Sequence, residues 1–131
     1  MKKNGFTLVE VLAVVVIIAI LALITIPIID RVMKDGREGA YASTISTILD
    51  AAYDYVQIKP GLLPDADSTT TFTLGEIKKE GLLKKDLKNP KTGAQFSDSC
   101  RIQITMHSEY TAPLHDRQKF FGNYLFEFIE S

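Results

Sequence analysis

The residues whose types and spacing could do chemistry gather near Met1. A lysine pair precedes Gly5 and Phe6, and Glu10 stands directly before a run of 14 apolar residues, Val11–Ile24. A carboxylate at the start of a lipid-facing helix is costly unless a cation or water meets it, so Glu10 is a candidate functional residue. The alternative interpretation is a residue at the headgroup level whose carboxylate reaches water.

The segment that must position Glu10 is apolar enough to cross a membrane. Residues 6–29 include 20 apolar side chains among 24, and the 19 residues of 11–29 carry no charge. As a helix these 19 residues rise about 28 Å, which matches the hydrocarbon core of a bilayer. A cleaved secretory signal fits poorly, because the run is long and no small-residue cleavage site follows it. Pro27 predicts a kink or helix break near the end of the run.

This arrangement resembles the N-terminal signal of type IV pilins and the related pseudopilins. The residues concerned are the sequence KKNGFTLVE at positions 2–10 and the apolar segment after it. The resemblance implies a leader peptide, residues 1–5, that a prepilin peptidase cuts between Gly5 and Phe6 before it methylates the new amine of Phe6. It also implies that Glu10 is the family glutamate, fifth in the mature chain, and that Pro27 is the helix-breaking proline of many members.

The resemblance further implies a structural subunit rather than an enzyme, with no cofactor. Its partners would be other subunits of a homo- or hetero-oligomeric filament, the prepilin peptidase, membrane lipid before assembly, and an assembly ATPase with its platform protein. The resemblance places the N-terminus in the cytoplasm and the rest outside, first as a single-pass protein of the cytoplasmic membrane and then in a surface filament. The positive-inside rule leaves this orientation open, since basic residues flank both ends of the segment. In the filament, Glu10 is expected to pair with the amine of a neighbouring Phe6 and to set axial register.

Residues 30–131 have the composition of a small soluble domain, with 39 apolar and 28 charged residues among 102. The net charge of −1 for the whole chain gives no general attraction to nucleic acid or anionic membrane. Cys100 is the single cysteine, so this domain must be held together by packing alone. The lack of a cysteine pair argues against the disulfide-closed loop of many Gram-negative pilins and favours a Gram-positive or pseudopilin type.

The pattern of residues 30–131 predicts an α+β head built on the second half of a long helix. Apolar residues at helical spacing extend an interrupted helix from Phe6 to Ile58, with two helices joined by a linker over 30–39 as the alternative. Thr73–Glu76 predicts a capping box that opens a short helix, 74–80, ended by Gly81. Alternation predicts strands near 100–107 and 123–130, paired across a loop of residues 108–121, and a short strand near 70–73. The predicted apolar stripe comprises Tyr41, Ile45, Ile48, Leu49, Ala52, Tyr53 and Val56.

The other candidate sites in the head are weaker. His107 and His115 are too few and too isolated to indicate a metal site or catalytic base. Asp65 and Asp67, with Asp54, could supply oxygen ligands for calcium, but they lack the spacing of a calcium loop. The lysines of residues 78–91 are a weak candidate for DNA binding, since a solvated lysine face is the more common role. Cys100 is expected to be a buried small apolar residue.

The function that these patterns favour is a structural subunit, a prepilin, of a type IV pilus or pseudopilus-like filament. The alternative is a single-pass membrane-anchored protein with a small extracytoplasmic binding or sensing domain. An enzyme accessory subunit is a third interpretation without specific support. The N-terminal pattern is shared by adhesion pili, secretion pseudopili and DNA-uptake filaments, and by major and minor subunits.

Overall fold

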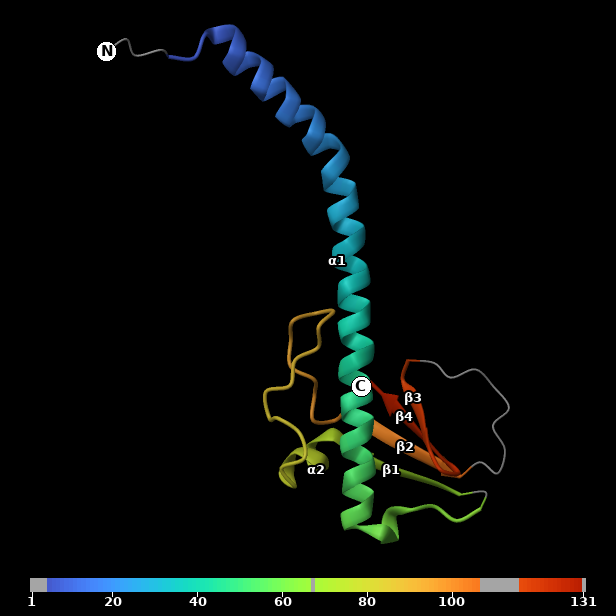
Figure 1. The fold of residues 1–131 in the computed structure, drawn as a ribbon. Helices are drawn as coiled ribbons and strands as arrows, with labels where there is room; N and C mark the ends of the chain where they lie inside the picture. Colours follow the sequence, from blue (N-terminus) through green and yellow to red (C-terminus); the bar gives the residue numbers. More distant parts are fainter. Residues whose placement is uncertain (1–4, 67, 107–115, 131) are drawn as a thin grey trace. The chain divides into compact units, whose positions relative to one another are not determined.

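The chain forms two compact units, Met1–Gly36 and Arg37–Ser131 (Figure 1). The computed structural model describes residues 5–66, 68–106 and 116–130. The helix α1 (Leu8–Ile58) contributes to both units. The first unit has no other helix or strand among its described residues, whereas the second contains the sheet and the core.

Helix α1 is continuous, so of the kink or helix break predicted at Pro27 the break does not occur. Pro27 lies inside α1, with helical residues on both sides. A proline removes one backbone hydrogen bond of the helix, and the helical segments on either side of it retain their other backbone hydrogen bonds. The alternative with a linker over residues 30–39 is wrong as well, because Gly36 and Gly39 are helical. Each glycine costs a helix only about 1 kcal/mol relative to alanine, which a 51-residue helix tolerates.

The second unit contains one antiparallel sheet with strand order β1-β2-β4-β3. Its strands are β1 (Thr69–Thr73), β2 (Arg101–Met106), β3 (Gln118–Phe121) and β4 (Tyr124–Ile129). The predicted pairing of the two long strands is confirmed, with Ile104 of β2 opposite Phe126 of β4. Strand β3 contradicts the prediction of a loop over 108–121. It is joined to β4 through Gly122 and Asn123, and Gly122 has a φ of +62°. A Gly-Asn pair between aromatic residues is a hairpin signal that the prediction overlooked.

The short helix α2 (Leu74–Lys79) begins and ends close to the prediction. The capping box is confirmed: the Thr73 N–H donates to the Glu76 carboxylate at 2.8 Å, and the Glu76 N–H donates to the Thr73 hydroxyl at 3.4 Å. Gly81 follows with a φ of +76°, which a side chain at that position would strain. A 3₁₀ turn, η1 (Pro60–Leu62), follows α1.

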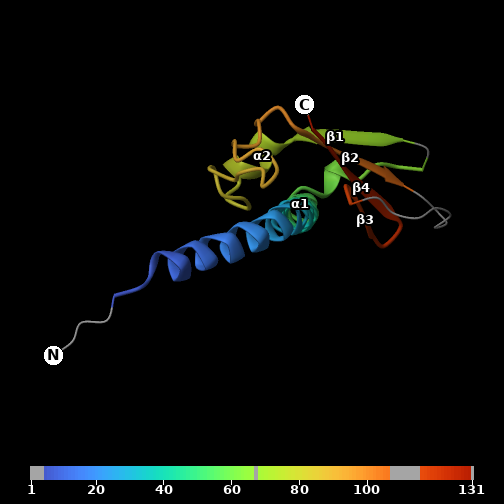
Figure 2. The same cartoon turned by 90° about the horizontal axis from the view of Figure 1, so that it is seen from above.

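The core of the second unit lies where α1 packs on the sheet, and α2 with its following loop lies beside α1 and contributes to the same core (Figure 2). Most of the predicted helical stripe is buried there. Tyr53 is an exception, since 37% of it is exposed and its ring stacks on Phe121 with centroids 4.4 Å apart. Tyr55 is buried instead, and its ring centroid lies 5.0 Å from that of Phe72. Cys100 is buried, as predicted, and the predicted α+β class is confirmed.

Candidate functional site

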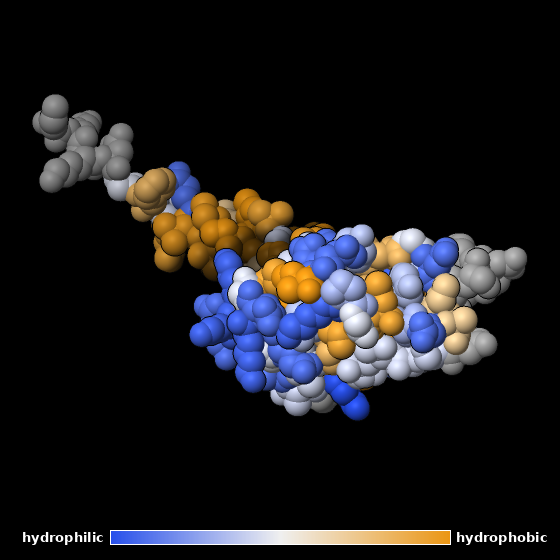
Figure 3. Space-filling model, turned by 90° about the horizontal axis from the view of Figure 1, so that it is seen from below, coloured by the Kyte–Doolittle hydropathy of each residue, from blue (hydrophilic) through white to orange (hydrophobic). Residues whose placement is uncertain are grey.

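The apolar side chains of the first unit are exposed among the residues that the structure describes. Buried residues of α1 begin at Tyr41, and Phe6 is 87% exposed. Figure 3 shows the contrast between the apolar surface of this segment and the largely hydrophilic surface of the head. By length and composition, α1 is the one helix of the described chain that could cross a membrane. A helix that is apolar on all sides is stable only in lipid or against other apolar surfaces.

Glu10 is held at the start of α1 by a second capping box. The Thr7 N–H donates to the Glu10 carboxylate at 3.2 Å, and the Glu10 N–H donates to the Thr7 hydroxyl at 3.2 Å. The helix N-terminus also favours the negative charge of this carboxylate. The prediction missed this role of Glu10, although Thr-x-x-Glu is the same signal that identified the box at Thr73.

The structure places Phe6 and Glu10 on one hollow of the first unit. This shallow hollow, about 210 Å³, is also lined by Val11, Val14 and Val15. Among the described residues, no cation lies within ion-pair distance of Glu10. The Glu10 carboxylate therefore accepts the Thr7 N–H but has no counter-charge within the described chain.

Several other predicted site residues do not form a site. His107, His115 and Asp67 lie outside the described residues. Asp54 and Asp65 are exposed, and no group of three or more metal-ligating side chains exists within the described ranges.

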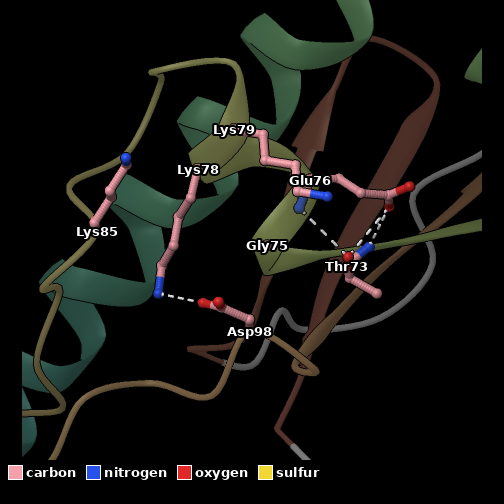
Figure 4. Close-up of a pocket in the computed structure, with 7 residues that line it drawn as sticks. All are labelled: Thr73, Gly75, Glu76, Lys78, Lys79, Lys85 and Asp98. Carbon is pink, nitrogen blue, oxygen red and sulfur yellow. Dashed lines mark hydrogen bonds and ion pairs between the residues drawn. The ribbon is translucent and has the colours of Figure 1, made fainter.

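The lysines of residues 78–91 do not all belong to a solvated face. Lys78 is only 6% exposed, and its ammonium donates to the Asp98 carboxylate at 2.8 Å (Figure 4). Lys91 lies over the ring of Tyr41, 4.3 Å from its centroid. The expectation of a solvated lysine is therefore wrong for Lys78, because the turn that carries Asp98 packs against α2. A partner 20 positions away in the chain leaves no local signal in the sequence.

We expect Asp98→Ala to destabilise the head by about 1–2 kcal/mol, because it leaves the buried Lys78 ammonium without a counter-charge. The effect is below the 3–5 kcal/mol of a fully buried pair, since Asp98 is 73% exposed. Lys78→Met keeps the packing and removes the charge, so its expected cost is under about 1 kcal/mol. Urea unfolding of the full chain in nonionic detergent, followed by circular dichroism, measures both. Equal costs for the two variants would contradict this account.

A carboxylate near the end of β4 joins three parts of the head. Glu130 accepts hydrogen bonds from the Tyr41 hydroxyl at 3.0 Å and the Asn89 amide at 3.2 Å, and Arg117 lies 3.7 Å away. Asn89 is buried and its side chain also accepts from the Lys91 N–H at 2.9 Å. Residues 89–93 form a turn, in which the N–H groups of Thr92 and Gly93 donate to the Asn89 carbonyl, and Asn89 thereby ties this turn to α1 through Glu130. Burial, and then the hydrogen bond to Glu130, raise the pKa of Tyr41 above its ordinary value.

The raised pKa of Tyr41 predicts a loss of stability at alkaline pH. The folded head holds the phenol proton more tightly than the unfolded chain does. This stabilisation is complete below the ordinary tyrosine pKa of about 10 and is lost as the pH rises through the higher pKa of the folded state. The urea midpoint should therefore fall more steeply above about pH 10 in the wild type than in Tyr41→Phe. Parallel pH profiles of the two proteins would refute the assignment.

Comparison with known protein families gives a match at the N-terminal segment. Residues 1–26 match the family described as the prokaryotic N-terminal methylation motif. No curated protein and no solved structure matches the chain. This motif indicates a prepilin-type precursor that is processed at the N-terminus, and the long apolar helix with an α+β head is compatible with that class.

The match at residues 1–26 supports the interpretation of the chain as a type IV pilin- or pseudopilin-like prepilin. The motif implies processing by a prepilin peptidase and filament assembly in general, and the apolar helix fits membrane anchoring before assembly.

Proposed function

We propose that the chain is the precursor of a structural filament subunit of the pilus or pseudopilus type. The observation that carries the proposal is the methylation motif at residues 1–26, most of which forms the start of α1, where the apolar side chains are exposed. Such a surface is first solvated by lipid and is then buried against the same helices of neighbouring copies. The subunit acts by association, and the proposal assigns it no catalytic residue.

Processing prepares the end of the helix for assembly. A cut between Gly5 and Phe6 leaves a cationic amine at the end of the apolar segment, and methylation keeps that amine basic. Glu10 lacks a cation among the described residues, so the amine of a neighbouring Phe6 supplies the counter-charge that the subunit itself does not. An unpaired buried charge costs several kcal/mol, so only the register that pairs every amine with a carboxylate is stable.

The proposed path of the subunit runs from the cytoplasmic membrane to a surface filament. The leader lies in the cytoplasm, where the peptidase acts, and the head lies outside. An assembly ATPase acting through a platform protein then lifts the subunit from lipid into the growing filament. No described feature of the head selects adhesion, secretion or DNA uptake as the task of that filament.

Intact-mass analysis after co-expression with a prepilin peptidase tests this proposal. The expected product lacks residues 1–5 and carries one added methyl group at Phe6. The matched control is Gly5→Leu, since no atom crowds a side chain at position 5 in the fold but a large one blocks the peptidase. Retention of Met1 in the wild type, or a cut beyond Ile29, would support the membrane-anchored alternative instead.

A further inference from the structure

A short charged segment follows the apolar part of α1 directly (Figure 1). We name residues 30–35 the charged segment; its charged side chains are Asp30, Arg31, Lys34 and Asp35, and all four are exposed. The segment lies beyond residues 1–26, so the match to the methylation motif does not account for it. Val32 and Met33, in the middle of the segment, are 63% and 51% exposed. Both its polar and its apolar side chains are thus uncovered.

The charges of this segment have no partner within the described chain. Asp30 and Lys34 are four positions apart, as are Arg31 and Asp35, which is the spacing of ion pairs within one helix. Neither pair forms in the structure, and none of the four side chains has an ion-pair partner among the residues described. These groups are therefore free to meet the charges of another molecule.

The order of the charges is self-complementary. The signs are minus and plus at 30 and 31, and plus and minus at 34 and 35. Two parallel copies of α1 without a stagger would place like charges opposite each other. A stagger of four residues, about 6 Å along the helix, places Lys34 beside the Asp30 of the next copy and Asp35 beside its arginine. Staggers of three or five residues each bring two like charges together instead.

We propose that the charged segment forms ion pairs with the same segment of a neighbouring parallel copy, in a stagger of four residues. This inference rests on the proposed filament role. There, Glu10 meets the Phe6 amine of a neighbour, and these two residues are also four positions apart. The uncharged residues 11–29 between the two sites select no stagger by themselves, because hydrophobic contact is non-directional.

A second copy fits this segment better than a lipid surface does. The two basic and two acidic side chains cancel, so the segment has no net charge with which to attract anionic lipid. A contact between staggered parallel copies uses two different parts of the same surface. Such a contact repeats from copy to copy and produces an open filament.

Two separate charge reversals test the pairing in cells that express the assembly machinery. Lys34→Glu and Asp30→Lys each place like charges opposite one another in adjoining copies. Each should lower filament yield, measured as sheared filament relative to subunit in the membrane fraction, at least about ten-fold. Co-expression of the two variants should restore most of the yield, because the acidic position 34 of one copy then meets the basic position 30 of the other. Mixing copies cannot restore an ion pair within a single helix, so restoration is specific to contact between copies.

Arg37→Glu is the matched control, because it makes the same charge reversal at an exposed position of α1 outside the proposed pairs. It should assemble at the wild-type yield. A greater loss with Arg37→Glu than with Lys34→Glu would overturn the four-residue stagger. Wild-type yield with Lys34→Glu, or no restoration on co-expression, would overturn the pairing while wild-type filaments leave the filament role standing. A wild-type protein that is processed but forms no filaments would overturn both.

Discussion

Glu10→Gln should lower filament yield at least about 100-fold in cells that express the assembly machinery. Glutamine keeps the side-chain oxygen that the capping box uses, so α1 still begins at the same residue. The negative charge is lost, however, and the proposed amine of a neighbouring Phe6 is then buried without a counter-charge. A broken buried pair costs about 3–5 kcal/mol, which is a factor of roughly 100 or more per contact.

Thr7→Ala is the matched control for this prediction. It removes the hydroxyl that accepts from the Glu10 N–H but leaves the carboxylate charge unchanged. Loss of a cap costs about 1 kcal/mol, so the yield should fall less than about ten-fold. Yield is measured as sheared filament relative to subunit in the membrane fraction, which separates assembly from expression. Wild-type yield with Glu10→Gln would remove the basis for the proposed pairing.

Phe126→Ala should destabilise the head by about 3–5 kcal/mol, the largest stability effect that we expect from a single substitution. Phe126 is fully buried on the inner face of β4, with its ring centroid 5.0 Å from that of Phe121 and 6.3 Å from that of Tyr53. Its removal leaves a cavity at the contact of α1 with the sheet. This loss is a large part of the 5–15 kcal/mol that holds a typical domain folded.

Leu125→Ala is the matched control, because it makes the same kind of substitution in β4 without removing a fully buried side chain. Leu125 is the neighbouring residue on the opposite face of β4 and is only half-buried, so its expected cost is about 1 kcal/mol. The tyrosine signal in near-ultraviolet circular dichroism reports on the head, because the chain has no tryptophan. Equal urea midpoints for the two variants would show that the core is not centred on Phe126.

The sequence predicted best those features that depend on local pattern. The apolar helix, the box at Thr73 and the stop at Gly81 each follow from neighbouring residues, and the structure confirms them. Which side chains of α1 are buried depends on the elements that pack against the helix. The predicted stripe therefore wrongly included Tyr53 and omitted Tyr55.

Features that depend on distant parts of the chain were missed. Strand β3 has only four residues, and one of them, Lys119, lies 2.6 Å from Asp50 of α1. A lysine beside two aromatic residues gives no alternation by which to recognise a strand, so the Gly-Asn pair after it was the local signal available. At the assembly site, the residues Phe6 and Glu10 could be selected from the sequence. Their positions on one hollow required the structure, whereas the cap formed with Thr7 has a Thr-x-x-Glu signal in the sequence that the prediction overlooked.

The contact between α1 and β4 has a consequence for biosynthesis. The stripe on residues 41–56 finds its cover only when residues 124–129 have been made, about 70 residues later in translation. Contacts so distant in sequence form slowly, because a long loop must close first. On the proposed route, the apolar segment reaches the membrane while the head is still unfolded, and the stripe is accessible to chaperones and proteases during that interval. Quality control of this protein should act on the head rather than on the membrane anchor.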